Sequence, residues 1–133
     1  AEHQELWVRA YLPLTRIDYD VLTLVKELHQ LDIKTPVLSN TIPPHVRANR
    51  QRGLFDLFDP EIFSCEVGYR KPDPKIYEIA LEQSGNPPPQ ETVYVDDLPK
   101  YVDAATNLGL KGVLYQNCPQ LRRELKVLGI KLQ

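Results

Sequence analysis

Two short segments of the sequence carry side chains that could together hold a phosphate group. Ser39 and Asn40 follow a short apolar run, and a hydroxyl beside free backbone amides at the tip of a strand forms a cradle for phosphate. Lys71 lies just before a predicted helix, where Pro72 and Pro74 hold the backbone extended. A fixed ammonium there would neutralise a phosphoryl oxygen or an ionised carboxylate. Taken singly, Ser39 and Asn40 are better explained as an ordinary turn, and Lys71 as a solvated surface lysine, than as parts of a functional site.

A third segment supplies paired carboxylates. Asp96 and Asp97 follow the apolar run at residues 92–95, which is the clearest strand pattern in the chain. Two adjacent carboxylates repel each other, so they need a cation or strong hydrogen-bond donors nearby. Magnesium, a hard ion that prefers oxygen ligands, is the natural occupant. Taken singly, this pair is as consistent with a helix cap, but the three segments together, each at the end of a predicted strand, favour one functional site.

The elements that must position these residues alternate along the chain. Apolar residues at helical spacing, with prolines and glycines at the expected ends, predict helices over residues 21–31, 43–52, 74–84, 99–108 and 119–128. Short apolar runs predict strands over residues 35–38, 62–67, 92–95 and 113–115. Strands separated by helices of this length favour an α/β fold with a parallel sheet. In such folds ligands bind outside the carboxyl ends of the strands.

The bulk composition excludes several classes of function. The chain has 133 residues, which suits one domain, and its 42% hydrophobic content indicates a globular core. A net charge of −2 argues against a nucleic-acid surface, and without a run of about 18 apolar residues no membrane span is predicted. The polar start has no signal-peptide core, so a cytoplasmic location is expected. Cys65 and Cys118 fit no metal spacing and are expected to be free, buried thiols.

The three segments resemble motifs of the haloacid dehalogenase-like superfamily, close to its sugar-phosphate phosphatase branch and to the phosphatase domain of soluble epoxide hydrolases. Residues 37–40 look like the second motif of that family, residues 68–77 like the third, and residues 93–97 like the fourth. The resemblance covers about residues 18–129. It implies a three-layer, Rossmann-like core with a parallel sheet of the haloacid dehalogenase type.

The resemblance also implies roles for individual residues. Ser39 and the amide of Asn40 would hold phosphate, and Lys71 would pair with both the nucleophile and the phosphate, so Ser39 and Lys71 are the expected catalytic residues. Asp97 would ligate Mg²⁺ directly, and Asp96 would support the ion either as a ligand or from behind one. Haloacid dehalogenases proper lack the paired aspartates, which favours phosphate ester hydrolysis over dehalogenation.

The sequence departs from the family pattern in two ways. Leu98 and Tyr101 occupy places where the family usually shows a small polar residue and then Asn or Asp, so Tyr101 supplies no carboxylate to a metal. The larger departure is the first motif, whose aspartate nucleophile and second aspartate two residues later are missing. Asp18-Tyr19-Asp20 has that spacing, but no apolar strand precedes it and an amphipathic helix follows, so we reject it.

The missing motif has consequences for the domain and its sheet. Residues 1–17 are expected to be the remnant of a cap domain or linker, and residues 18–133 to form the core. In the family the nucleophile strand lies between the strands that end at Ser39 and Asp97, so without it their backbone groups lose ladder partners. An upstream fragment, a rearranged N-terminal segment such as residues 6–12, or strand exchange in a homodimer would each repair the sheet.

Three functions remain in competition. The favoured one is a phosphohydrolase core that, in an intact parent, hydrolyses phosphate monoesters of a small metabolite with Mg²⁺; the chain alone is expected to be inactive, because covalent catalysis needs the aspartate nucleophile. The alternative is a non-catalytic module of the same fold that binds phosphate or a protein partner. A response-regulator receiver fails, because receivers place the acid pair first in the chain and here it comes last.

Overall fold

A computed structural model of the chain describes residues 19–133. The helices are α1 (Tyr19–Gln30), α2 (Pro43–Gln51), α3 (Ser64–Val67), α4 (Pro74–Gln83), α5 (Pro99–Asn107) and α6 (Cys118–Val127), with a short 3-10 helix, η1 (Pro89–Glu91). The strands are β1 (Val37–Ser39), β2 (Glu61–Phe63), β3 (Val93–Asp96) and β4 (Lys111–Leu114). The expected remnant at residues 1–17 and Asp18 lie outside the described range. No helix within it is long and apolar enough to cross a membrane.

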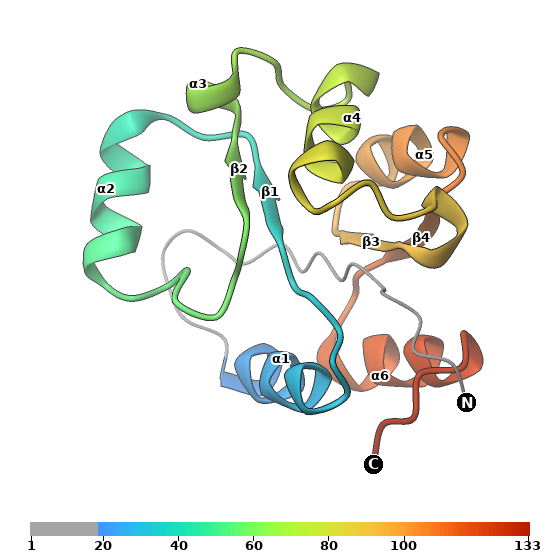
Figure 1. Ribbon diagram of the computed structural model, residues 1–133. Helices are drawn as coiled ribbons and strands as arrows, with labels where there is room; N and C mark the ends of the chain where they lie inside the picture. The colour runs from blue at the N-terminus through green and yellow to red at the C-terminus, as the bar shows by residue number, and fades with distance from the viewer. Residues whose placement is uncertain (1–18) are drawn as a thin grey trace.

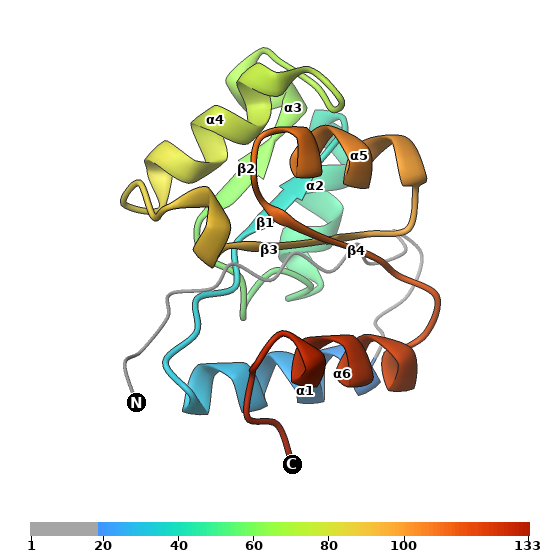
Figure 2. The same cartoon turned by 90° about the vertical axis from the view of Figure 1, so that its right-hand side faces the viewer.

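The elements form three layers. In Figure 1, α1 and α6 lie side by side below the strands. The view in Figure 2 shows α4 and α5 on the other side of the strand layer. Proline in the first turn begins α2, α4, α5 and α6, because its fixed φ suits a helix start and its missing N–H is not needed there. The predicted three-layer α/β fold is confirmed.

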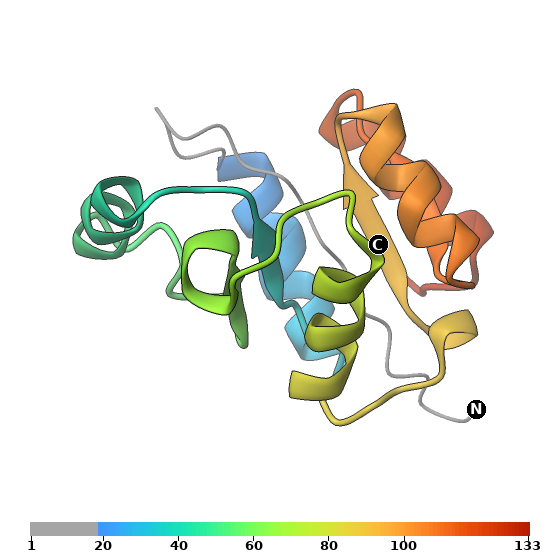
Figure 3. The same cartoon turned by 90° about the horizontal axis from the view of Figure 1, so that it is seen from above.

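The strands form two separate parallel pairs. β1 pairs with β2, with Leu38 opposite Ile62, and β3 pairs with β4, with Val95 opposite Val113. Across residues 19–133 no backbone ladder joins β1 to β3. Seen from above in Figure 3, the cyan strand β1 and the gold strand β3 lie apart from each other. From the sequence we expected an additional segment to repair the sheet between the strands ending at Ser39 and Asp97, and no strand among residues 19–133 fills that place.

Strand β3 is buried on both faces, and its side chains alternate between two core clusters. Val93 and Val95 pack with Leu24 of α1 and Leu121 of α6, on one face of the strand layer. Tyr94 joins the opposite cluster, which includes residues of α4 and α5. This alternation follows from the two-residue period of a strand, and burial on both faces explains why residues 92–95 read as a continuous apolar run.

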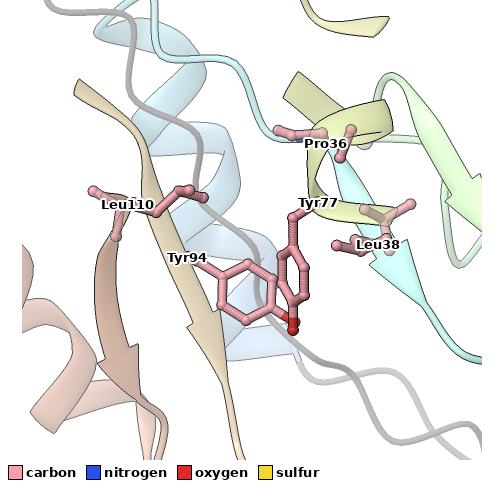
Figure 4. A pocket seen from close by; sticks show the side chains of 8 residues that line it. Pro36, Leu38, Tyr77, Tyr94 and Leu110 are labelled. Atoms are coloured by element: carbon pink, nitrogen blue, oxygen red, sulfur yellow. The ribbon is translucent and has the colours of Figure 1, made fainter. Parts of the chain in front are cut away.

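An apolar pocket lies between β1 and β3 (Figure 4). Pro36 and Leu38 line it from the β1 side, and Tyr94 and Leu110 line it from the side of β3 and β4. The ring of Tyr77, from α4, meets the ring of Tyr94 edge to face, with 5.3 Å between the ring centroids and 71° between the planes. Side-chain contacts of this kind, rather than backbone hydrogen bonds, connect the two half-sheets in the described residues.

Two sequence-based predictions are corrected here. The strand predicted over residues 62–67 ends at Phe63, and Ser64–Val67 forms helix α3, which Gly68 ends with a left-handed φ of 85°. The apolar run at residues 62–67 suggested a strand, but Cys65 and Glu66 lie at the surface as a short helix allows. Cys65 and Cys118 are both free, as predicted, but Cys65 is exposed and only Cys118 is buried.

Helix α6 offers a matched test of the core below the strands. Leu125 is fully buried, whereas Val127, two residues further along the same helix, is 86% exposed. We expect Leu125→Ala to lower the free energy of unfolding by about 2–5 kcal/mol, because it removes buried methyl groups and leaves a cavity. Val127→Ala is expected to change it by no more than about 0.5 kcal/mol. Urea denaturation followed by circular dichroism measures both, and equal losses would contradict this placement of α6.

Candidate functional site

The three segments singled out in the sequence meet at the carboxyl ends of β1 and β3. The ammonium of Lys71 donates to a carboxylate oxygen of Asp96 at 2.9 Å and to the carbonyl oxygen of Leu38 at 3.4 Å. Lys71 is 2% exposed and Asp96 is fully buried. Lys71 and Pro72 form a turn that is closed by a hydrogen bond from the backbone N–H of Asp73 to the carbonyl oxygen of Arg70 at 2.9 Å, and the Lys71–Pro72 peptide bond is cis. The extended backbone predicted around Lys71 is therefore wrong. A lysine on a solvated surface is therefore excluded, and Lys71 is a component of the core.

The carboxylate of Asp96 is surrounded by donors. One oxygen accepts from Lys71 and from the hydroxyl of Tyr94, and the other accepts from the backbone N–H groups of Asp97 at 2.8 Å and Leu98 at 3.4 Å. Tyr94 reaches Asp96 because residues two apart on a strand face the same side. Donors of this kind favour the ionised carboxylate and compensate it for leaving water. The ionised, buried carboxylate of Asp96 thus stabilises the charged form of the Lys71 side chain.

The side chain of Asn40 fixes the backbone of Lys71. Its carbonyl oxygen accepts from the N–H of Lys71 at 2.8 Å, and its amide nitrogen donates to the carbonyl oxygen of Lys71 at 3.1 Å. The same amide nitrogen donates to the hydroxyl of Tyr101 at 3.2 Å. The sequence singled out only the backbone amide of Asn40, as a phosphate donor. The structure adds this second use of the residue, which joins the tip of β1 to the segment that carries Lys71.

Tyr101 covers the ammonium of Lys71. Its ring lies with the centroid 4.6 Å from the Lys71 nitrogen, close enough for a cation–π interaction. Its backbone carbonyl accepts from the hydroxyl of Tyr77 at 2.9 Å, which connects α5 to α4. The departure at this position therefore replaces a carboxylate by an aromatic contact with Lys71. The roles of Tyr77 and Tyr94 were missed in the sequence, although the spacing of Tyr94 and Asp96 placed both on one face of the strand.

Asp97 and Ser39 lie at the rim of the same site. Asp97 is exposed for the most part. The pKa of its carboxyl is raised because part of the side chain is buried, because it shares a hydrogen bond with Asp96, and because Asp96 carries a negative charge. The positive charge of Lys71 acts in the opposite direction. Ser39 ends β1 and is 6% exposed, with its hydroxyl 3.5 Å from the carbonyl oxygen of Asn40. Asp97 is therefore close enough to Lys71 to feel its charge, and Ser39 lies next to Leu38, whose carbonyl oxygen accepts from the Lys71 ammonium.

The two carboxylates are of the chemical type that binds a magnesium ion, but few of their oxygens are available as ligands. Oxygen ligands are the kind that Mg²⁺ prefers, and it is commonly held by one or two carboxylates together with water and phosphate oxygens. Asp97 projects from the strand tip, whereas both oxygens of Asp96 already accept hydrogen bonds. Within residues 19–133, no group of three or more His, Cys, Asp or Glu side chains is placed to hold a metal. Asp97 is thus the residue that would hold the ion.

The sequence of this chain is similar to those of characterised hydrolases. A family model described as haloacid dehalogenase-like hydrolase matches residues 2–109. Bifunctional epoxide hydrolase 2 of Sus scrofa is 32% identical over 123 residues, which cover 88% of this chain and 22% of that protein. Flavin mononucleotide hydrolase 1 of Arabidopsis thaliana is 35% identical over 69 residues, covering 52% of this chain and 28% of that protein. The chain thus spans less than a third of the length of these two relatives.

Solved structures share the arrangement of helices and strands. An uncharacterised protein from Corynebacterium glutamicum superposes with a TM-score of 0.77 at 23% identity, over 99% of both chains, and shows the same fold. A magnesium complex of a HAD family enzyme from Bacteroides thetaiotaomicron gives a TM-score of 0.71 at 26% identity, over 80% of this chain and 58% of that one. The same enzyme with magnesium and inorganic phosphate gives 0.68 at 25% identity, over 75% and 53%.

The buried pair of Lys71 and Asp96 is testable by a double-mutant cycle. We expect Asp96→Asn to lower the free energy of unfolding by about 3–5 kcal/mol, because it leaves the Lys71 ammonium buried without a counter-charge. Lys71→Met should also destabilise the protein. The double variant should lose less than the sum of the two single losses, by about 0.5–3 kcal/mol. Chemical denaturation of all four proteins provides the measurement, and strictly additive losses would show that the two side chains do not interact.

The raised pKa of Asp97 predicts a pH-dependent stability. The folded protein holds the Asp97 proton more tightly than the unfolded chain, so the ionised carboxylate destabilises the fold above its folded-state pKa. We expect Asp97→Asn to raise the free energy of unfolding at pH 7 by at most about 0.5 kcal/mol, because the side chain is exposed. The gain should vanish below the unfolded-state pKa of about 3.9, where both states are protonated. Urea denaturation at several pH values measures it.

The control for this experiment is Asp103→Asn, which alters an exposed carboxylate within α5. The difference between the two variants isolates the effect of the strand-tip position. A gain for Asp97→Asn that is the same at every pH, or a loss at pH 7, would contradict the assigned direction.

Proposed function

Because the chain belongs to the haloacid dehalogenase-like hydrolases, we propose that it forms the core of a phosphohydrolase that acts on a small phosphorylated metabolite. One observation carries this proposal. The ammonium of Lys71 is buried at the ends of β1 and β3, with its charge held by Asp96 and its backbone held by Asn40. A fixed cation beside a strand-tip hydroxyl is the arrangement that a transferring phosphoryl group needs.

Each residue of the site has a part in this proposal. The Lys71 ammonium neutralises an oxygen of the phosphoryl group, and the Ser39 hydroxyl with the backbone amide of Asn40 holds a second one. Asp97 holds a magnesium ion, which neutralises further negative charge on the phosphate when bound. Asp96 and Tyr101 keep the ammonium at one position, so little reorganisation is needed when charge develops there.

The nucleophile in this proposal is an aspartate carried by an additional strand between β1 and β3. Its carboxylate attacks phosphorus and displaces the alcohol, and water then hydrolyses the acyl phosphate to release inorganic phosphate. Among residues 19–133, Asp96 cannot take this part, because both of its oxygens accept hydrogen bonds within the core. Asp97 is needed for the metal. The strand would come from an upstream fragment, because a second copy of this chain would carry the same residues and could repair the sheet but not supply the aspartate.

The geometry of the two half-sheets supports this additional strand. β1 and β3 each have one partner among the described residues, β2 and β4, and run parallel to it. The apolar pocket between them is lined by Leu38 and Tyr94, which suits the apolar side chains of a buried strand. A strand inserted parallel to both would end at the level of Lys71, so a carboxylate at its tip would meet the ammonium.

A second candidate function is a module that binds phosphate without hydrolysing it. The pairing of Lys71 with Asp96 favours this alternative, because the ammonium already has a counter-charge in the described part of the chain. Such a module would retain the phosphate cradle and lack turnover. For either function we propose the cytoplasm as the compartment, in keeping with two free cysteines.

The proposal predicts turnover only when an aspartate is supplied. We expect the chain alone to hydrolyse an aryl phosphate negligibly, with or without Mg²⁺. A synthetic peptide of apolar residues ending in Asp-x-Asp should bring magnesium-dependent hydrolysis, and the same peptide with Asn-x-Asn should not. Lys71→Met should lower the peptide-dependent rate by about 10²–10³, because it removes a fixed charge from the phosphoryl group.

The matched control is Lys131→Met, which removes an exposed lysine near the end of the chain and should leave the rate unchanged. Lys71-dependent phosphate binding without hydrolysis under any of these conditions would favour the binding module. Neither phosphate binding nor hydrolysis would refute both candidates.

A further inference from the structure

A second pocket opens beside the site. It has a volume of about 250 Å³ and is lined by Asn40, Thr41, Ile42, His45, Ser64 and Arg70. Asn40 is shared with the site, since its side chain binds both backbone groups of Lys71. Arg70 directly precedes Lys71 in the chain. A small molecule whose phosphate lies at Lys71 would therefore have this pocket next to its other end.

The charge of the pocket is positive. Among residues 19–133, its two ionisable lining residues are Arg70, which is always protonated, and His45, and no acidic side chain lines it. In the part of the chain that the structure describes, Arg50 pairs with Glu61 and Glu66, and Arg122 pairs with Glu27, whereas no ion pair engages Arg70. The guanidinium of Arg70 is thus available to an anion, and its planar set of donors suits a carboxylate or a phosphate.

The wall of the pocket is held in place by its own hydrogen bonds. The hydroxyl of Ser64 accepts from the backbone N–H of Thr41 at 2.9 Å and donates to the carbonyl oxygen of Thr41 at 3.2 Å. The backbone N–H of His45 donates to the carbonyl oxygen of Ile42, and the two residues before His45 are prolines without N–H groups. An anion here would therefore be bound by side chains and not by the free amides of a helix start.

We infer that this pocket binds a second anionic group of the substrate, through Arg70 and His45. The inference rests on the proposed function and narrows it to phosphate monoesters that carry a further carboxylate or phosphate. The pocket suits a small group, because ligand pockets for whole drug-sized molecules are commonly about 300–1,000 Å³. Substrates that lack the second charge would lose the contacts of Arg70 and His45 and would bind more weakly.

A matched pair of non-hydrolysable ligands tests this inference on the full chain. 3-Phosphonopropionate carries a phosphonate and a carboxylate, and propylphosphonate has the same chain length without the carboxylate. We expect the first to bind at least about tenfold more tightly in an NMR titration, since charge-assisted contacts of this kind are each worth about a factor of ten. Arg70→Gln combined with His45→Gln should abolish the difference. Arg47→Gln, on the same helix as His45 but outside the pocket lining, should preserve it.

The outcomes separate this inference from the proposed function. Equal binding of the two ligands, no binding of either, or a difference that survives Arg70→Gln with His45→Gln would overturn the inference. The phosphate site is tested separately by Lys71→Met, which should weaken both ligands, and by propylphosphonate, whose binding the pocket variants should leave unchanged. If Lys71→Met leaves the affinity for propylphosphonate unchanged, the proposed phosphate site is wrong.

Discussion

The buried ion pair between Lys71 and Asp96 is the constraint on which the site depends. A charged amine in a protein core is tolerated only where a counter-charge and hydrogen bonds replace water. Here the pair joins the strand that ends at Asp96 to the loop that carries Lys71. The hydroxyl of Tyr94 also donates to Asp96. Asn40 attaches the tip of β1 to the same loop. Elements distant in sequence therefore meet at one edge of the strand layer because of one charge that must be satisfied.

The ion pair also helps to connect the two strand pairs of the interrupted sheet. Among the described residues, β1 and β3 share no ladder, yet their tips are held together through Leu38, Lys71 and Asp96. The contact of Tyr77 with Tyr94 and the hydrogen bond from Tyr77 to Tyr101 add to this connection. Tyr101, where the resemblance led us to expect Asn or Asp, helps to cover a lysine. The same position thus serves the stability of the site more than metal binding.

Much of this arrangement could be predicted from the sequence, and the physical reason is local. Runs such as residues 92–95 are buried on both faces, and the residues after them must lie at the strand tip, which placed Asp96 and Lys71 in one site. The sequence assigned Asp96 to a magnesium ion, and its ion pair with Lys71 was not predicted. The side-chain contacts of Asn40 and Tyr101 could not be predicted, because they depend on how β1, α5 and the loop before α4 pack together. The end of β2 was missed for a similar reason: Phe63 is buried by its neighbours, but nothing local distinguishes Ser64–Val67 from a continued strand.

The divided strand layer also bears on kinetics. Breaking a continuous sheet requires the loss of a row of backbone hydrogen bonds, whereas separating the two pairs described here would leave both ladders intact. Proteins open along boundaries of this kind at a lower free energy than global unfolding, as partial unfolding units. For residues 19–133, opening the middle of the layer would therefore be a motion of the two strand pairs against each other. Its rate would be limited by the release of Tyr77 from Tyr94 and of Lys71 from its partners.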